Sequence, residues 1–325
     1  MAVATYHRNA MNICIVTPAP PRSRKGNRVT ALRWARILRE LGHRVHVEQA
    51  YNGRPCNVMI ALHARRSFTS IERFVRDRPE LPLIVALTGT DIYGDLPTSP
   101  QVRKSIDIAV RLVVLQPTAI DELPQRLRDK ARVIYQSVRR PARAVQARKD
   151  VFEVCVLGHL RQVKDPFRTA MAARLLPATS RVQVTHVGAA LSEASARRAR
   201  AEAACNPRYH WLGELPRWKA LRVLARSRVL VLSSRMEGGA NVVSEAIAAS
   251  VPVVSSRIPG SIGLLGADYP GYFPVGNTRM LASLLARLER DAGFHRSLQA
   301  WCKRLAPLVD PKRERQSWAR LLREV

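Results

Sequence analysis

The chain has 325 residues, of which 46% are hydrophobic and 24% charged, which is typical of a globular protein and excludes a disordered or fibrous one. It carries 54 Lys and Arg residues against 25 Asp and Glu residues, a formal net charge of +29. Such an excess indicates an anionic partner, which could be nucleic acid, a membrane surface or a phosphorylated small molecule. The basic residues are spread over helical stretches such as 31–40 and 195–203, so most of them are expected to be solvated surface charges.

Membrane insertion and export are not expected. No apolar run approaches the ~20 residues that a membrane helix needs, and the first ten residues lack the apolar core of a secretory signal. We therefore expect a cytoplasmic protein whose five scattered cysteines are reduced, with Cys14 and Cys155 as small core residues. None of the histidines lies at ligand spacing from a cysteine, so no metal site is expected.

Short apolar runs alternate with amphipathic stretches along the whole chain. A helix is predicted from Arg28 to Leu41, closed by Gly42. Strands alternating with helices predict parallel βαβ units whose sheets are covered on both faces. The predicted strands are 12–17, 43–48, 57–62, 82–88, 111–116 and 131–136 in the first half, and 152–158, 181–188, 208–213, 228–233 and 251–256 in the second.

A polar stretch at 139–150, which contains Pro141, separates the two halves. The predicted fold class is α/β, with two doubly wound, Rossmann-like domains facing a central cleft. The final segment is amphipathic, with Trp318, Leu321 and Leu322 at helical spacing. The predicted divisions are an extension at 1–11, a first domain at 12–140, a linker at 141–150, a second domain at 151–305 and a terminal helix at 306–325.

In such folds ligands bind beyond the carboxyl ends of the strands, so the turns after the strands are the expected places for a site. Neither GxGxxG nor a Walker A loop follows any predicted strand. The most informative turn follows the run at 228–233, where Glu237 precedes Gly238 and Gly239 and a helix is expected from Ala240–Asn241. A helix N-terminus suits a diphosphate, and Glu245 farther along could accept hydrogen bonds from a ribose diol.

With this turn the chain resembles the retaining glycosyltransferases of family 4, which have the two-domain GT-B fold. Glu237 and Glu245 stand at the positions of that family's E-x7-E pair. The resemblance implies that Glu245 holds the nucleotide ribose and that Glu237 lies beside the donor sugar. It also implies backbone N–H contacts to the donor from Gly238, Gly239, Ala240, Asn241 and Val242.

A second turn, at 157–166, resembles the family's diphosphate-binding segment. Gly158, Leu160 and Lys164 match that segment, whereas His159 replaces its usual Arg. Arg161 is the neighbouring cation that could compensate, and whether His159 or Arg161 takes the role of the missing Arg stays open. Charge-assisted hydrogen bonds from such groups would neutralise the leaving nucleotide.

Two further turns are candidates for the acceptor. In the turn after 12–17, Gly26 and Asn27 precede the helix expected near Arg28, and Arg22, Arg24 and Lys25 add positive charge. So basic a loop indicates a small anionic acceptor. In the turn at 86–96, Thr88 replaces the family's His before Gly89, Thr90 and Asp91, and His63 could approach the same region.

As a whole the sequence is similar to the selenosugar synthases of bacterial selenoneine biosynthesis, on the segments 18–45, 87–96, 157–166, 237–246 and 256–276. This resemblance implies transfer from a UDP-sugar, UDP-GlcNAc or UDP-glucose, to selenophosphate, without metal or other cofactor, to give a 1-selenosugar and UDP. The implied catalytic residues are Glu237, Arg161 and Lys164; donor-binding residues are Glu245, Gly238, Gly239, Ala240, Asn241, Val242, Gly158 and His159; acceptor-binding residues are Arg24, Lys25, Gly26, Asn27, Arg28, Thr88 and Asp91.

Three alternatives remain. The first is a family-4 glycosyltransferase with another small anionic acceptor, such as a hydroxy acid or a sugar phosphate. The second is a nucleotide-sugar epimerase of the same fold. The third is a nucleic-acid-binding protein, which the charge alone would favour, but the sequence has no basic-aromatic motif or tail and only 6% aromatic residues. We therefore expect no nucleic-acid partner.

Overall fold

The computed structural model describes residues 10–139, 148 and 150–325. Most of the predicted extension and most of the predicted linker lie outside the described residues. The chain divides into two compact units, one formed by Met1–Ile134 together with Glu314–Val325 and the other by Tyr135–Arg313. The last residues of the chain thus belong to the unit built by its first part.

The first unit is built on a six-stranded sheet in the order β2-β1-β3-β4-β5-β6, and every pair of neighbouring strands is parallel. All six strands predicted in the first half of the chain are confirmed. Their bounds are β1 (Asn12–Val16), β2 (Arg44–Glu48), β3 (Val58–Leu62), β4 (Leu83–Leu87), β5 (Arg111–Val114) and β6 (Ala131–Val133).

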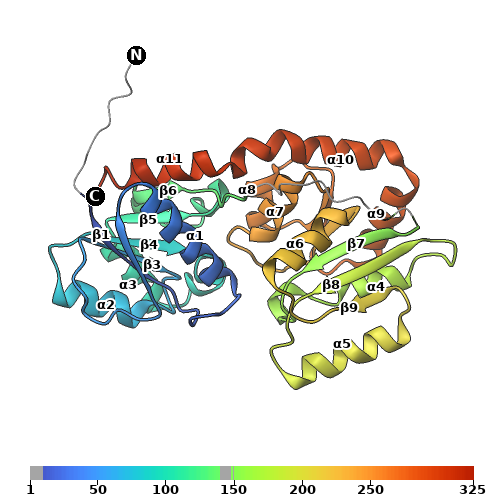
Figure 1. Ribbon diagram of the computed structural model, residues 1–325, viewed down its shortest axis with the longest axis horizontal. Helices are drawn as coiled ribbons and strands as arrows, with labels where there is room; N and C mark the ends of the chain where they lie inside the picture. Colours follow the sequence, from blue (N-terminus) through green and yellow to red (C-terminus); the bar gives the residue numbers. More distant parts are fainter. Residues whose placement is uncertain (1–9, 140–147, 149) are drawn as a thin grey trace, which may run out of the picture. The chain divides into compact units, whose positions relative to one another are not determined.

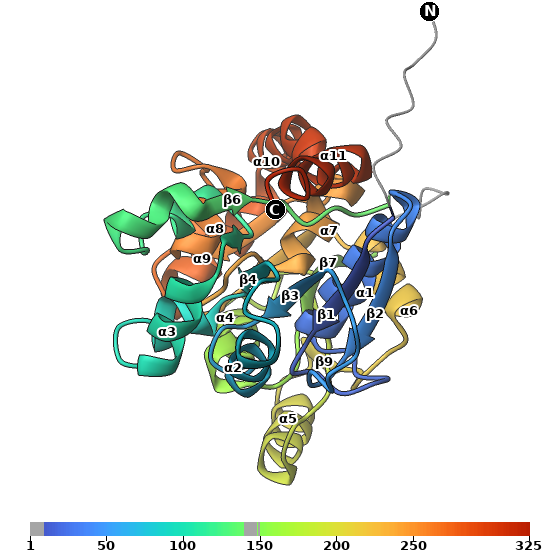
Figure 2. The ribbon, with the colours of Figure 1, turned by 90° about the vertical axis from the view of Figure 1, so that its left-hand side faces the viewer.

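Helices cover both faces of this sheet (Figures 1 and 2). Ile13 and Ile15 of β1 pack with α1 (Gly26–Glu40) and α11 (Pro311–Leu321), whereas Cys14 and Val16 pack with α2 (Phe68–Asp77) and α3 (Pro100–Ile108). Alternate residues of one strand point to opposite faces, so an uninterrupted apolar run fills two hydrophobic cores.

The second unit repeats this plan, with a parallel sheet in the order β12-β11-β10-β7-β8-β9. The strands are β7 (Phe152–Leu157), β8 (Val182–Val187), β9 (Tyr209–Trp211), β10 (Val229–Leu232), β11 (Val253–Ser256) and β12 (Tyr272–Phe273). Its helices are α4 (Arg168–Arg174), α5 (Glu193–Cys205), α6 (Arg217–Arg226), α7 (Asn241–Ala249), α8 (Pro259–Leu265), α9 (Thr278–Arg290) and α10 (Ala292–Leu305).

The five strands predicted in the second half are confirmed, and β12 was not predicted. It has only two residues between Gly271 and Pro274, too short a run to be recognised as a strand. Short helical turns complete the two units: a π-helix at Asp91–Asp95 and 3-10 turns at Pro117–Ala119, Gln125–Lys130, Gln162–Lys164 and Ala306–Val309. The prediction of two doubly wound Rossmann-like domains is confirmed.

The first helix differs slightly from its prediction. It runs from Gly26 to Glu40, so Gly26 and Asn27 form its first turn instead of preceding it. A glycine and a short polar residue are both accommodated in a first turn, whose N–H groups need no helical partner. Gly42 has φ +93° and donates its N–H to the carbonyl of Arg39 (2.9 Å), which is the helix-ending role predicted for it.

The terminal helix α11 is fixed to α1 by a buried cluster. Trp318 is fully buried, with its ring 4.8 Å from the ring of Trp34 in an edge-to-face arrangement, and Leu321 and Leu322 are buried beside it. The carboxylate of Glu314 is also buried and accepts hydrogen bonds from Trp34 Nε1 (2.8 Å) and Arg33 Nε (3.2 Å). An ion pair and an aromatic pair therefore join segments that lie at opposite ends of the sequence.

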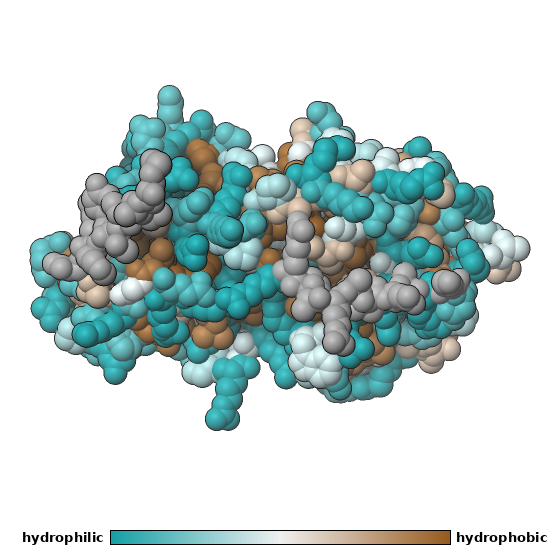
Figure 3. Space-filling view, turned by 45° about the horizontal axis from the view of Figure 1, so that its top comes forward, coloured by the Kyte–Doolittle hydropathy of each residue, from teal (hydrophilic) through white to brown (hydrophobic). Residues whose placement is uncertain are grey.

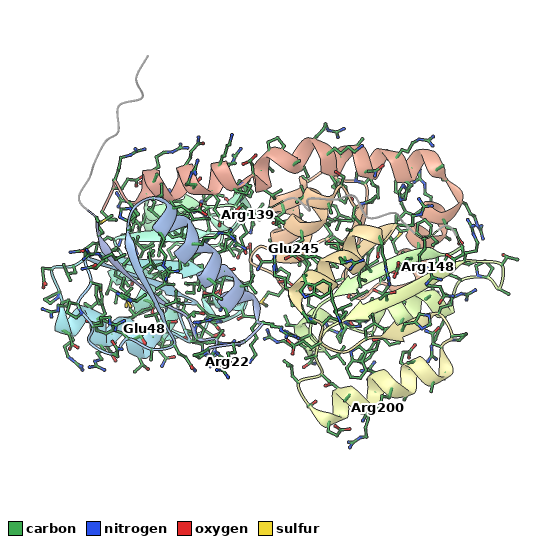
Figure 4. All side chains as sticks on the ribbon, viewed as in Figure 1. Arg22, Glu48, Arg139, Arg148, Arg200 and Glu245 are labelled. Atoms are coloured by element: carbon green, nitrogen blue, oxygen red, sulfur yellow. The ribbon has the colours of Figure 1, made fainter. Side chains whose placement is uncertain are left out.

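The excess positive charge lies largely at the surface. The face drawn in Figure 3 is covered mainly by hydrophilic side chains, and basic side chains such as Arg200 of α5 project outward in Figure 4. The expectation for Cys14 and Cys155 is confirmed, since both are buried free thiols. Within the described ranges, no helix combines the length and apolar character needed to cross a bilayer.

Replacing Glu314 by Ala should lower the stability of the first unit, because Arg33 would lose its buried counter-charge. Removing one partner of a buried ion pair costs about 3–5 kcal/mol, which urea denaturation followed by tryptophan fluorescence would detect. Arg315→Ala, an exposed change on the same helix, is the matched control. Equal midpoints for the two variants would show that the buried pair does not hold α11 in place.

Candidate active site

The turn after β10 places Glu237 in a defined position. Its side chain is 12% exposed and forms an ion pair with Lys164 through Oε1. The same oxygen accepts a hydrogen bond from the hydroxyl of Ser234 (2.7 Å). Glu237 is thus a nearly buried carboxylate held by a cation and a hydroxyl group.

Lys164 comes from the turn after β7, and that turn is attached to the end of β10. The hydroxyl of Ser233 donates to the carbonyls of Lys164 (3.1 Å) and Asp165 (2.9 Å). The N–H of Arg235 donates to the carbonyl of Val163 (2.8 Å). Since β7 and β10 are adjacent parallel strands, their following turns meet at one edge, and these bonds fix one turn against the other.

A close backbone approach fixes the other side of Glu237. Gly260 lies in the first turn of α8, and a Cβ atom on it would be only 2.0 Å from the carbonyl oxygen of Glu237. Real Cβ atoms essentially never come so close, so this position requires glycine. Sequence reasoning missed Gly260, although a Pro-Gly pair shortly after a strand is the signal that could have found it.

The glycine-rich stretch after Glu237 leads into α7. Gly238, Gly239 and Ala240 are buried, and the carbonyl of Gly239 accepts a hydrogen bond from Nε2 of the buried Gln136 (2.7 Å). Helix α7 begins at Asn241, and its N-cap residue, Ala240, makes no side-chain capping bond. Val242 follows in the first turn, so the beginning of α7 offers backbone dipoles suited to an anion.

Glu245 lies one turn farther along α7, in the position labelled in Figure 4. Its side chain is only 5% exposed, and Oε1 lies 2.5 Å from Nη1 of Arg217 at the start of α6. The Arg217 side chain is 47% exposed, so a buried carboxylate pairs with a cation that also reaches solvent. No sequence pattern singles out Arg217, which is 28 residues before Glu245.

His159 has a structural contact in the turn after β7. Its Nδ1 accepts the N–H of Ala189 (3.1 Å), which follows β8. Arg161 is half-buried, and its guanidinium makes no hydrogen bond or ion pair within the described part of the chain. The geometry thus commits His159 to a backbone contact and leaves Arg161 as an available cation beside Lys164.

The turns after β7 and β8 also touch through their backbones. A Cβ atom on Gly188 would be 1.9 Å from the carbonyl oxygen of Gly158. The same oxygen is 3.0 Å from Nε2 of His186, whose Nδ1 is 2.9 Å from the hydroxyl of Tyr209. Burial lowers the pKa of His186 to about 4, so the ring is neutral near pH 7, donating to Gly158 and accepting from Tyr209. His186 therefore positions Gly158, a role that the sequence did not indicate.

The first unit carries the predicted basic loop. Lys25 immediately precedes α1, whose N-terminus has no side-chain cap. Arg24 and Lys25 are exposed, whereas Nε and Nη1 of Arg28 are buried and have no hydrogen-bond partner among the residues described. Buried guanidinium nitrogens without an acceptor are costly, and a bound anion would remove that cost.

The turn from Thr88 to Asp91 is organised by its own aspartate. Asp91 is fully buried, and its carboxylate accepts the N–H groups of Thr88 (2.9 Å), Gly89 (2.8 Å) and Ala64 (3.1 Å). In this structure Asp91 therefore ties the turn after β4 to the turn after β3. Its oxygen atoms accept backbone N–H groups, so the role that the structure shows for Asp91 is to hold the turn together.

Comparison with known proteins shows the family to which the chain belongs. Residues 139–303 match the sequence profile of the family described as glycosyl transferases group 1. The chain belongs to the glycosyl transferases group 1. The matched segment contains Glu237, Glu245, Arg161 and Lys164. None of the curated proteins compared with the chain matches it.

Solved structures similar to this group 1 glycosyl transferase show the same GT-B fold. HepE of Anabaena, in complex with UDP and glucose, has a TM-score of 0.76 and 14% sequence identity, with 97% of this chain and 100% of that chain covered. Sucrose-phosphate synthase from Thermosynechococcus elongatus has a TM-score of 0.76 and 14% identity, covering 96% and 98%. A glycosyltransferase from Rickettsia africae has a TM-score of 0.71 and 12% identity, covering 98% and 99%.

Replacing Gly260 by Ala should displace Glu237, because the added methyl group overlaps a backbone carbonyl that cannot rotate away. Overpacking of this kind costs about 1–3 kcal/mol, and a lowered melting temperature would report it. Gly158→Ala is the control, since a Cβ atom there meets nothing within 4 Å. The proposed close approach would be contradicted if the two variants melted at the same temperature as the original protein.

Proposed function

We propose that this glycosyl transferase moves a sugar from a UDP-sugar, UDP-GlcNAc or UDP-glucose, to selenophosphate, giving a 1-selenosugar and UDP for selenoneine biosynthesis. The observation that carries the proposal is the Lys164–Glu237 pair, which joins the turns after β7 and β10 beside the start of α7. A UDP donor is supported by the similar HepE structures, which contain UDP with glucose or UDP-glucose.

The donor is assigned to the second unit. Glu245 would accept hydrogen bonds from the ribose, and the backbone of Gly238, Gly239, Ala240, Asn241 and Val242 would donate to phosphate and sugar oxygens. Gly158 and His159 would border the diphosphate. Glu237, oriented by Ser234 and Lys164, would lie beside the sugar ring.

Catalysis would rest on positioning and on stabilising the departing UDP. The selenium of selenophosphate forms a bond to the anomeric carbon, while the bond from that carbon to the diphosphate oxygen breaks and its electron pair leaves with UDP. Arg161 and Lys164 would neutralise the charge that develops on the diphosphate, a task that preorganised cations perform well. If the phosphoryl group then leaves selenium, one water molecule is consumed and inorganic phosphate is released.

The acceptor is assigned to the first unit, where positive charge surrounds the start of α1. Arg24, Lys25, Gly26, Asn27 and Arg28 would hold the anion, with the turn from Thr88 to Asp91 as a further contact. The buried, unpartnered nitrogens of Arg28 support an anionic ligand at this loop. Selenophosphate is a compact anion and a strong nucleophile, so it needs cations but neither a large pocket nor a strong base.

The experiment that tests this function measures UDP release from a panel of UDP-sugars, with and without selenophosphate. UDP release that requires selenophosphate, with a selenium-containing sugar as product, would support the proposal. Release that requires a hydroxy acid or a sugar phosphate instead would assign the chain to another small anionic acceptor. Conversion of the UDP-sugar to an isomer without UDP release would indicate an epimerase.

Replacing Glu245 by Ala should raise the KM for the UDP-sugar about 10-fold or more, because a hydrogen bond to a charged group contributes about 1.5–3 kcal/mol. Arg217 is partly exposed, so water can solvate it once the carboxylate is gone. Steady-state kinetics and the melting temperature would separate a binding defect from unfolding. Glu193→Ala, at an exposed carboxylate on α5, is the control, and unchanged donor kinetics in Glu245→Ala would remove the ribose assignment.

Replacing Lys25 or Arg28 by Ala should raise the KM for selenophosphate by about 10- to 100-fold, the equivalent of one charge-assisted contact to an oxyanion. The dissociation constant of UDP should change much less, because UDP is assigned to the other unit. Arg36→Ala removes an exposed cation from the same helix and should leave both constants unchanged. Equal loss of UDP affinity, or wild-type selenophosphate kinetics, would place the acceptor elsewhere.

A further inference from the structure

The first unit contains a pocket lined by five residues, of which Thr90 and Asp95 lie inside the predicted turn at 86–96. Its volume is about 420 Å³, and it is lined by Arg65, Arg66, Thr90, Asp95 and Gln101. The lining comes from the turn after β3, the turn and π-helix after β4, and the first turn of α3. The pocket therefore lies at the carboxyl edge of the first sheet, where ligands of this fold class bind.

The two turns that frame the pocket are tied together. Asp91 accepts hydrogen bonds from the N–H of Ala64 in one turn and of Thr88 in the other. His63 has φ +70°, a left-handed conformation that is uncommon for this residue type, and its buried ring reaches Oγ1 of Thr90 through Nε2 (2.9 Å). Strained backbone of this kind persists where the surroundings hold it and is frequent at functional sites.

The hydrogen bonds of His63 determine that the hydroxyl group of Thr90 can donate to a ligand in the pocket. Nδ1 accepts the N–H of Arg66 (3.3 Å), so the neutral ring carries its hydrogen on Nε2 and donates it to Thr90. Burial lowers the pKa of His63, which favours this neutral form. The hydroxyl hydrogen of Thr90 is then available to a ligand.

The charges of the lining residues leave one cation uncompensated. Nη1 of Arg65 lies 2.8 Å from Oδ1 of Asp95, so these two charges offset each other. Arg66 is exposed, and its guanidinium makes no hydrogen bond or ion pair within the ranges described. Helix α2 begins at Phe68, directly after this turn, and the hydroxyl of its N-cap residue Ser67 donates to the carbonyl of Leu62 instead of capping the positive end of the helix. The charged residues that line the pocket, two arginines and one aspartate, therefore leave an excess positive charge that favours a negative ligand.

We propose that this pocket is an anion-binding subsite for the acceptor of the transfer reaction, with Arg66 as its principal cation and Thr90 as its hydroxyl donor. The inference rests on the proposed function and adds a residue that determines acceptor specificity. Strand β3 lies between β1 and β4 in the sheet, so the turns that carry Lys25, Arg66 and Thr90 follow three neighbouring strands at one edge. A tetrahedral oxyanion, which needs more than one donor group, is the chemical class that fits.

The first test replaces Arg66 by Ala and measures acceptor kinetics in the full-length protein. The KM for selenophosphate should rise about 10-fold or more, the KM for the UDP-sugar should stay within twofold, and Arg66→Lys should recover part of the loss. Arg76→Ala, which removes an exposed cation from α2, the helix that follows the turn of Arg66, is the matched control. Wild-type acceptor kinetics in Arg66→Ala, or the same change in Arg76→Ala, would overturn the proposal.

A second test keeps this inference separate from the proposed reaction. Inorganic phosphate and selenophosphate are titrated into the protein without any UDP-sugar, and binding is followed by ³¹P line broadening. Binding that Arg66→Ala weakens and Arg76→Ala leaves intact supports the subsite, even if no UDP-sugar is turned over. Absence of binding to the wild-type protein, or binding that Arg66→Ala does not change, overturns it. Failure of UDP release alone would overturn only the proposed function.

Discussion

The first unit depends on a buried charge that comes from the far end of the chain. Glu314 has no access to solvent, and its carboxylate is satisfied by Arg33 and Trp34 of α1. A carboxylate is costly to bury unless it is paired and hydrogen-bonded, so α11 has a single favourable position on this sheet. Because α11 also covers one face of the sheet with Trp318 and Leu321, the first unit is complete only when the chain returns to it. The turns that carry the basic loop and the Arg66 pocket belong to that unit.

The second unit is held at its functional edge by polar contacts between turns more than by side-chain packing. Ser233, Lys164 and Glu237 fasten the turns after β7 and β10 to each other. Gly188 and Gly260 allow backbones to approach at distances that no other residue permits. These contacts fix the turns of this edge against one another, which suits the proposed reaction, in which groups are positioned around a leaving diphosphate.

Regular structure was predictable because it depends on local patterns. Runs such as 58–62 and 229–232 are apolar on both faces, which distinguishes strands of a parallel sheet from other elements. The helix ending at Gly42 followed from a glycine after an amphipathic stretch. Strand β12 was not predicted because two residues are too few to show an alternating or apolar pattern. The start of α1 was predicted two residues late because glycine and asparagine are weak helix formers.

By itself the sequence determined the order of the elements, the two-domain α/β class and the positions of Glu237, Glu245 and Lys164, since strand runs and turn residues are encoded locally. Only the tertiary structure decided which groups meet. Asp91 is used to hold two turns together, Arg217 pairs with Glu245, and Glu314 binds α1 across 280 residues of sequence. The partner of a charge depends on distances between segments remote in the chain, and no local pattern records those distances. For the same reason the sequence does not predict the pocket of Arg66 and Thr90, which exists because the fold brings the turns after β3 and β4 together.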